Sequence, residues 1–449
     1  MESRLDQRLS YSEERFWRGE QPQPDTSTFV ECPRHLPLIA RIGGPLDAQR
    51  LYDTLVAVVA RHEVLRSRFV ERRGTPRRVI ADLQSNWLTV TDFGAGSDIG
   101  SAPSLVDLLH EDVNRRFDLA EAPLIRARLI KVANDHVLVF VMHHIVCDGW
   151  SKLVLAREIG LCYEADACTE CLPPLNSGYG DYVRRQRAAA RSPHRSEQLR
   201  YWAARLAGMT PLVVPGDRAR APDGSTSSRT HRFSIAAERA EGLRALARAH
   251  RLTPGVTAAA VLKVLLWRLT GVDDVAIGMP FAERNRSEFD GVVGLFLNLL
   301  ILRTDLSGNP AFVEVLQRVK QTFVEAYDRS DTPYSQLLQS LGRDAARVSV
   351  VFNFITVRRA SGLRMAGLDV DPIDVDVDSP SCADLSIHLF DRASELSGFV
   401  LYKKDRFSPQ YIARLSAGFD ALLGAAIDSP SCRIADLGRA TPEALATAV

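Results

Sequence analysis

One stretch of this chain decides how it folds: Val137-Leu138-Val139-Phe140-Val141-Met142-His143-His144-Ile145-Val146-Cys147-Asp148-Gly149-Trp150. Its first six residues are apolar and favour strands, which predicts a strand buried on both faces, although a short buried helix would show the same pattern. Neighbouring side chains on a strand point to opposite faces. If the strand persists to its end, His143 and His144 therefore have different surroundings. We expect one of them to face a cavity and the other to be held in the packing.

The residue types after the strand are compatible with several kinds of chemistry. A histidine can act as a general base because its pKa lies near neutrality, and Asp148 could either orient His144 or pair with an arginine and hold the turn. The backbone N–H of Gly149 could stabilise an oxyanion, and Cys147 could be a thiol nucleophile. The HHxxxD spacing could also bind a metal, but adjacent histidines on a strand point apart and chelate poorly. Without further context, both histidines could equally be core residues.

The composition is that of an ordinary globular protein. The chain has 449 residues, of which 46% are hydrophobic and 25% charged, and its net charge is +1. This balance does not support binding to nucleic acid or to a membrane surface, and the length suggests two or three domains. No apolar run approaches the roughly 20 residues that span a bilayer, and the N-terminus has no apolar signal segment. We expect a cytoplasmic protein whose seven cysteines are reduced thiols.

The rest of the chain alternates helical and strand patterns. Helix start signals occur at Ser10, with Glu13 three residues on, and at Thr253-Pro254. Short apolar strands are predicted at residues 275–277, 350–355, 384–390 and 398–402, followed by a closing helix near Ser408. A Pro- and Gly-containing segment from Cys171 to Tyr179 predicts a domain boundary. The pattern predicts a mixed α/β fold.

Two further side chains are candidates for a structural or a site role. Arg61 follows a predicted helix over residues 46–61 and begins a stretch with three arginines around an apolar stripe. Arginines around an apolar stripe are typical of a face that is solvated or forms salt bridges. The more specific hypothesis is a structural contact between an arginine and a carboxylate. Asn298 is the lone polar residue of an apolar run and requires a hydrogen-bond partner. Both roles remain open for Asn298.

The stretch His143–Gly149 matches HHxxxDG, and other motifs of the same family follow in the family's order. Leu9–Trp17 is similar to LSxAQxRLW, and Arg61–Phe69 is similar to RHExLRTxF. The remaining similarities are to YxDY, IGxFVN and the end of RD…MFNF, at Tyr179–Tyr182, Val293–Asn298 and Val351–Phe354. Together these motifs resemble the condensation-domain superfamily of nonribosomal peptide synthesis, which is related to chloramphenicol acetyltransferase. The resemblance extends over about residues 9–415.

The resemblance implies an α/β (α+β) fold of two chloramphenicol acetyltransferase-like subdomains, arranged as a V-shaped pseudo-dimer with an active-site tunnel between them. We place the N-terminal subdomain, with HHxxxDG, at residues 1–175. The C-terminal subdomain at residues 176–449 would include the linker, floor-loop and latch segments. A departure from the family lies at Arg329–Ser335, where HQDxPFE has lost its leading His-Gln and its closing Glu. This departure bears on acceptor contacts and partner docking more than on the chemistry.

The resemblance also implies roles for individual residues. His144 would be catalytic, taking a proton from the attacking amine or hydroxyl or positioning it, and Gly149 would offer its N–H to the oxyanion. Asp148 would be the family's structural acid. The supporting residues of the site would be His143 in the packing, Arg284 as the partner of Asp148, Asn298 in the tunnel, and Trp150 and Arg61. No metal is expected.

We expect a free-standing condensation enzyme, because the remaining residues hold no adenylation domain and no carrier-protein serine motif. It would transfer an acyl or aminoacyl thioester to an amine or hydroxyl acceptor, either a small molecule or a carrier-bound nucleophile. The protein itself would bind no cofactor. The donor would arrive on the 4'-phosphopantetheine of an acyl or peptidyl carrier protein acting in trans. A coenzyme A-dependent acyltransferase and a non-catalytic recruiting module are the alternatives, and the donor, the acceptor and the kind of product bond stay open.

Overall fold

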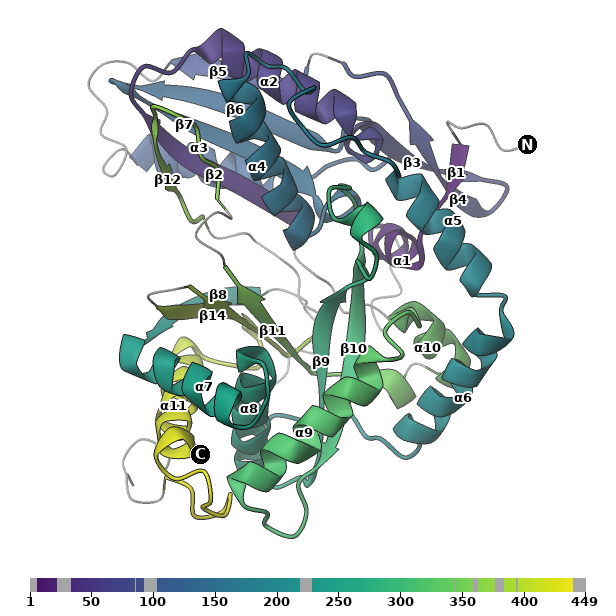
Figure 1. The fold of residues 1–449 in the computed structure, drawn as a ribbon, viewed down its shortest axis with the longest axis vertical. Coiled ribbons are helices and arrows are strands. Elements are labelled where there is room, and N and C mark those ends of the chain that lie inside the picture. The colour runs from purple at the N-terminus through teal and green to yellow at the C-terminus, as the bar shows by residue number, and fades with distance from the viewer. Residues whose placement is uncertain are drawn as a thin grey trace.

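The computed structural model describes residues 6–21, 34–84, 86–92, 103–218, 228–342, 344–357, 362–375, 383–392 and 395–438. Its ribbon shows an N-terminal half and a C-terminal half, each built on its own mixed sheet with helices packed on it (Figure 1). The mixed α/β architecture predicted from the sequence is therefore present.

The N-terminal half is organised around a five-stranded sheet in the order β12-β2-β7-β6-β5. Strand β7 lies in the middle and pairs antiparallel with β2 and β6, while β5 runs parallel to β6. The strands span Asp369–Pro372 (β12), His35–Gly43 (β2), Asp135–His143 (β7), Ile125–Val132 (β6) and Leu88–Asp92 (β5).

Strand β7 is buried on both faces. Leu138, Phe140 and Met142 belong to the core beneath helices α2 (Ala48–Arg61) and α4 (Gly149–Glu164). The intervening valines at 137, 139 and 141 belong to a second cluster with helix α3 (Pro103–Asn114). The predicted strand with two apolar faces is confirmed, and the alternation continues to its last residue, His143.

The C-terminal half contains a six-stranded sheet in the order β10-β9-β11-β13-β14-β8. Its strands span Leu297–Asp305 (β10), Asp274–Ala282 (β9), Val350–Thr356 (β11), Leu385–Asp391 (β13), Leu396–Lys403 (β14) and Ser228–Ile235 (β8). The helices of this half are α7 (Ala237–Ala249), α8 (Pro254–Thr270), α9 (Phe312–Tyr327) and α11 (Pro409–Asp428). Helices α7, α8 and α11 lie on the side of β8, β14 and β11 away from the N-terminal half (Figure 1).

The helix starts predicted at Ser10, Thr253 and near Ser408 are present, and each has a side-chain cap. The hydroxyl groups of Thr253 and Ser408 accept backbone N–H groups at the starts of α8 and α11. Ser10 caps α1 (Tyr11–Gly19), where its hydroxyl accepts the N–H of Glu13 at 3.0 Å and the Glu13 carboxylate accepts the N–H of Ser10 at 2.7 Å. Beside α1 lies a three-stranded sheet of β1 (Asp6–Arg8), β4 (Thr75–Ile80) and β3 (Ser67–Arg72).

The later part of the sequence contributes two segments to the N-terminal half. Strand β12 comes from the C-terminal part of the sequence but pairs antiparallel with β2 of the N-terminal sheet. Buried residues between Phe289 and Phe296 also belong to the N-terminal core. Helices α5 (Tyr179–Ala189) and α6 (Pro193–Leu206) connect the halves. The boundary proposed near residue 175 falls in the segment before α5 and stays a prediction.

None of the described helices alone is long and apolar enough to cross a membrane. Helices α7 and α8 reach that length and hydropathy only as a pair, which is bent by 104°. The first twelve residues of α8 after Pro254 are buried in the C-terminal core.

Candidate active site

The HHxxxDG motif forms the passage from a strand to a helix. Strand β7 ends at His143, the 3-10 turn η3 covers His144–Val146, and α4 begins at Gly149. Asp148 is the N-cap of α4, because its Oδ1 accepts the backbone N–H of Ser151 at 2.8 Å. A carboxylate at this position satisfies one of the N–H groups that have no acceptor inside the helix. The cap thereby fixes the turn that carries both histidines.

His143 is held in the packing. Its side chain is buried, its Nδ1 accepts the backbone N–H of Ile145 at 3.1 Å, and its Nε2 lies 3.8 Å from the carboxylate of Glu20. The rings of His35 and Phe117 flank it, each with its centroid 6.0 Å away. Burial lowers the pKa of His143. These are the contacts of a structural residue, which is the role expected for one of the two histidines.

The His144 imidazole has different surroundings. In the described chain no other residue hydrogen-bonds to its ring, and the Phe16 ring packs against it with a centroid distance of 5.2 Å. Its backbone N–H donates to the carbonyl oxygen of Arg34 at 2.7 Å, which fixes the main chain. Burial lowers the pKa of His144 to about 4, and its own backbone carbonyl and Asp148 oppose this only in part. At neutral pH the ring is therefore uncharged, which is the form that accepts a proton.

Asp148 connects the motif to the C-terminal half. Its Oδ2 accepts the backbone N–H of Phe296 at 3.0 Å, and its Oδ1 lies 3.3 Å from Nη2 of Arg284. Nη2 of Arg284 also donates to the Ser151 hydroxyl at 2.8 Å. The contact between Asp148 and Arg284 predicted from the resemblance is present. Of the two roles considered for Asp148, pairing with an arginine is the one its contacts match.

Gly149 is the first residue of α4, so its N–H has no acceptor within the helix. It is exposed, and a Cβ added to it would meet no atom within 4 Å. Trp150 follows and is 48% exposed, with its indole N–H donating to the carbonyl oxygen of Asp290 at 3.0 Å. The α4 N-terminus therefore borders open space at Gly149, while Trp150 contacts the segment before β10.

Asn298 lies at the start of β10 and is fully engaged by the protein. Its Nδ2 donates to the carbonyl oxygens of Ser330 and Thr332, each at 2.8 Å. Its Oδ1 accepts the backbone N–H groups of Leu299 and Tyr334, each at 2.9 Å. The three hydrogen bonds to Ser330, Thr332 and Tyr334 tie β10 to the start of α10 (Tyr334–Leu341), which is a structural role. A place for Asn298 in a tunnel stays a prediction.

Arg61 lies at the end of α2 and makes the predicted contact with a carboxylate. Its Nε is 3.5 Å from Oε1 of Glu158 on α4, and its guanidinium donates to the carbonyl oxygen of Pro173. His62 holds the other oxygen of the same carboxylate at 2.7 Å. The contact joins α2 to the later turns of α4, whereas HHxxxDG precedes the first turn. Arg61 therefore supports the helix that follows the motif.

The described residues do not favour the thiol and metal alternatives. Burial raises the pKa of Cys147 well above its usual value, so this thiol stays protonated, whereas a cysteine nucleophile needs a lowered pKa. No group of three or more His, Cys, Asp or Glu side chains in the described ranges could hold a metal ion.

Three neighbours of the histidine pair were not predicted from the sequence. Glu20 pairs with the Arg34 guanidinium at 2.6 Å and approaches His143, while Phe16 packs against His144. Phe16 belongs to the opening motif, so that motif was the available signal for it. Glu20 and Arg34 lie far from the histidines in the chain and had no signal of their own.

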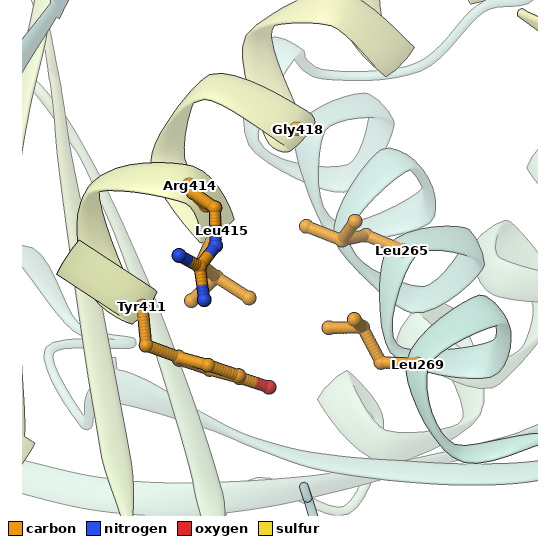
Figure 2. Close-up of a pocket in the computed structure, with 6 residues that line it drawn as sticks. All are labelled: Leu265, Leu269, Tyr411, Arg414, Leu415 and Gly418. Carbon is orange, nitrogen blue, oxygen red and sulfur yellow. The ribbon is translucent and has the colours of Figure 1, made fainter. Parts of the chain in front are cut away.

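A small pocket lies elsewhere, between α8 and α11 (Figure 2). The empty space between its lining residues is about 220 Å³, part of which is open solvent. Its lining consists of Leu265, Leu269, Tyr411, Arg414, Leu415 and Gly418. None of the predicted site residues belongs to it, and its mostly apolar lining offers no catalytic pair.

Two helix-backed mixed sheets, with a histidine pair where the central strand of one sheet ends, define a chloramphenicol acetyltransferase-like fold. The chain matches the family model "Condensation domain" over residues 6–445 and belongs to that family. The fold predicted from the resemblance, two chloramphenicol acetyltransferase-like subdomains, is confirmed by similarity to solved condensation-domain structures.

The similar proteins include a tripeptide synthetase, the SgcC5 protein and a domain from teicoplanin biosynthesis. The phosphinothricin tripeptide synthetase PhsC of Streptomyces viridochromogenes is 33% identical over 442 residues, which cover 96% of this chain and 40% of PhsC. The chain thus spans less than half the length of this curated relative. The SgcC5 structure from Streptomyces globisporus has a TM-score of 0.80 and 27% identity, and the similarity covers 95% of this chain and 100% of SgcC5. The X-domain in complex with OxyB from teicoplanin biosynthesis has a TM-score of 0.82 and 24% identity, covering 97% of this chain and 96% of that one.

Proposed function

We propose that this condensation domain transfers an acyl or aminoacyl group from a thioester to an amine or hydroxyl acceptor, forming an amide or an ester. The observation that carries the proposal is His144, a buried and uncharged imidazole to which no other described residue hydrogen-bonds. The turn around it is held by Asp148 and Arg284. An imidazole left unpaired by the protein is available to accept a substrate proton.

The proton transfer is assigned to Nε2 of His144, because Nδ1 is enclosed by protein. The N–H or O–H of the acceptor donates a hydrogen bond to Nε2 while its lone pair attacks the carbonyl carbon of the thioester. The tetrahedral intermediate then expels the sulfur with the electron pair of the C–S bond. His144 takes the acceptor's proton and returns it to the thiolate, so the products are an amide or ester and a thiol. General-base help of this kind is typically worth ~10²–10⁴-fold in rate.

Gly149 is the proposed donor to the oxyanion. Its N–H belongs to the first turn of α4, where the helix dipole favours negative charge. The open space beside its Cα supports this role, because a charged oxygen needs room near the N–H. Asp148 and Arg284 would act by holding the turn and would not touch the reacting atoms.

The donor is proposed to arrive on the 4'-phosphopantetheine arm of an acyl or peptidyl carrier protein, acting in trans, through a tunnel between the halves. Membership of the condensation domain family and the synthetase relatives support a carrier-bound donor. Holding donor and acceptor together in the reactive geometry can contribute roughly 7–11 kcal/mol. Positioning therefore supplies a larger share of the rate than the base does.

Both kinds of acceptor stay in the proposal. SgcC5 was crystallised with a naphthyl-substituted ethanediol, a molecule whose polar groups are hydroxyls. This ligand of a relative with the same fold supports an alcohol acceptor and hence an ester product. An amine is the stronger nucleophile at neutral pH and makes fewer demands on the base.

Mass spectrometry of a donor panel tests the proposal. Each acyl group is supplied both on a carrier protein and on coenzyme A, with structurally paired amine and alcohol acceptors. Condensed product from the carrier-bound donors is the expected result. Product from coenzyme A donors alone would identify a coenzyme A-dependent acyltransferase. Tight carrier binding without product from any donor would instead identify a recruiting module.

A further inference from the structure

Among the residues that the structure describes, the cation Arg15 on helix α1 has one close partner, an aromatic ring. Its two acids are paired: Glu13 contacts Arg78 at 2.8 Å, and Glu14 contacts both Arg18 and Arg187 at 2.7 Å. Within the ranges that the structure describes, the guanidinium of Arg15 has no carboxylate and no hydrogen-bond acceptor. Its contact is with the ring of Phe16, whose centroid lies 5.6 Å away.

The burial of Arg15 makes this absence notable. The residue is only 6% exposed, and burying a charge without a partner is unfavourable. Other buried arginines of this protein have acceptors, as Arg78 has in Glu13 and Arg284 has in Asp148. No nitrogen of the Arg15 side chain is both fully buried and without a hydrogen-bond partner. The guanidinium nitrogens, with which no described residue pairs, therefore retain a small exposure to solvent.

Arg15 lies close to the proposed reaction centre. The next residue, Phe16, packs its ring against the His144 imidazole, and the charge of Arg15 contributes to the lowered pKa of His144. Helix α1 packs against both the η3 turn of the N-terminal half and α10 of the C-terminal half. It lies where the two halves approach each other (Figure 1).

We propose that Arg15 binds a carboxylate carried by one of the two substrates while that substrate is held beside His144. The planar guanidinium matches a carboxylate with two parallel hydrogen bonds. The phosphate of a phosphopantetheine arm fits this place less well, because it lies at the opposite end of the arm from the thioester. This inference rests on the proposed function of the His144 site and deepens it.

The inference has a consequence for the acceptor. An amino acid loaded on a carrier protein has used its carboxyl group in the thioester, whereas a soluble amino acid keeps a free carboxylate. If the carboxylate belongs to the acceptor, Arg15 selects soluble acid acceptors over carrier-bound ones. If it belongs to the donor, Arg15 selects a diacid acyl group.

A first experiment measures binding without turnover. The charged or titratable groups that act on the His144 ring are Asp148, His143 and Arg15, so a carboxylate that neutralises Arg15 raises the pKa of His144. We expect benzoate to raise the pKa of His144, followed by NMR of the imidazole, by about one unit, and benzamide to leave it unchanged. The effect of benzoate is lost in Arg15→Gln and retained in the matched control Arg18→Gln, which changes the exposed arginine on the same helix. An equal effect of benzoate in Arg15→Gln would overturn the inference.

A second experiment locates the carboxylate. One arm compares a free amino acid with its carboxamide as acceptor, and the other compares a diacid half-thioester with its amide as donor. In the comparison whose substrate carries the bound carboxylate, Arg15→Gln lowers kcat/KM for the acid by about tenfold or more. It leaves kcat/KM for the amide unchanged. Equal losses for acid and amide in both arms would contradict the inference.

Two further results keep the outcome decisive. If Arg15→Gln fails to fold, Arg15→Lys and the benzoate–benzamide comparison in the unaltered protein decide, because the lysine keeps the charge but not the two parallel hydrogen bonds. A benzoate effect without any condensation would remove the proposed function and leave the carboxylate site. Condensation without preference for a carboxylate would remove the carboxylate site and leave the proposed function.

Discussion

Asp148 and Arg284 meet at 3.3 Å with side chains that are only 3% and 5% exposed. Asp148 caps α4 in the N-terminal half, whereas Arg284 follows β9 in the C-terminal half. A buried ion pair holds only when further hydrogen bonds satisfy both groups, and here Ser151 and the Phe296 N–H supply them. The contact therefore fixes the histidine turn relative to the second half.

Removing the Asp148 carboxylate should destabilise the fold. Asp148→Ala loses the cap of α4 and leaves Arg284 buried without its partner, for which we expect a loss of about 3–5 kcal/mol in the free energy of unfolding. Asp148→Asn keeps an acceptor for the cap and should lose less. Urea denaturation measures both. Arg184→Ala, which removes an exposed partner of Asp181, is the control and should change stability by less than about 1 kcal/mol. A fully stable Asp148→Ala would contradict the structural role.

Replacing His144 should separate the two kinds of acceptor. We expect His144→Ala to retain a larger fraction of its activity with a reactive amine than with the matched alcohol, because an alcohol depends more on proton removal. The loss with the alcohol should approach ~10²–10⁴-fold. The measurement is kcat/KM for paired acceptors with one donor. Equal retained fractions would count against proton transfer by His144.

The lowered pKa of His144 predicts an unusual pH profile. The ring is in its proton-accepting form above a pKa of about 4. With an alcohol acceptor, kcat/KM should therefore stay level from about pH 8 to about pH 5 and fall only as His144 becomes protonated. The free energy of unfolding should depend on pH in the same direction. As the pH falls, His144 is protonated in the unfolded state from about pH 6.5 but in the folded state only near pH 4. The stabilising contribution of the neutral ring is therefore complete above about pH 6.5 and declines toward pH 4. An acid limb near pH 6.5 in a folded protein would show that His144 is solvated.

Gly149 allows the N–H to be removed without disturbing the helix. Proline is favoured at the first helical position, and Asp148 before it has the extended backbone that a following proline requires. We expect Gly149→Pro to fold and to lose about 10²–10³-fold in kcat, the range for one lost oxyanion donor. Gly149→Ala keeps the N–H and meets no atom, so it should remain active. Equal activity of the two variants would remove Gly149 from the mechanism.

Patterns within a few residues predicted much of the fold. The apolar run before His143 gave the central strand, and its alternation predicted that two adjacent histidines would have different surroundings. Ser10, Thr253 and Ser408 marked helix starts because a cap is made within three residues of its hydroxyl.

Contacts between distant segments were less accessible. The pairing of Asp148 with Arg284 was predicted from the family resemblance. The Glu20–Arg34 pair beside His143 was not predicted, because neither residue differs locally from an ordinary surface charge. The apolar run around Asn298 indicated that its amide needs hydrogen-bond partners. The hydrophobic pattern could not identify the turn at Ser330–Tyr334 that supplies them.

The contribution of β12 to the N-terminal sheet has a consequence for handling the protein. Strand β12 covers the outer edge of β2, and Arg41 on β2 holds Asp369 and Asp371 from that strand. A fragment cut near residue 175 would expose unpaired backbone groups along β2, and such an edge recruits other chains. We therefore expect the N-terminal fragment not to behave as an independent monomer, so complementation by co-expressed halves is a better route to split versions than isolated fragments.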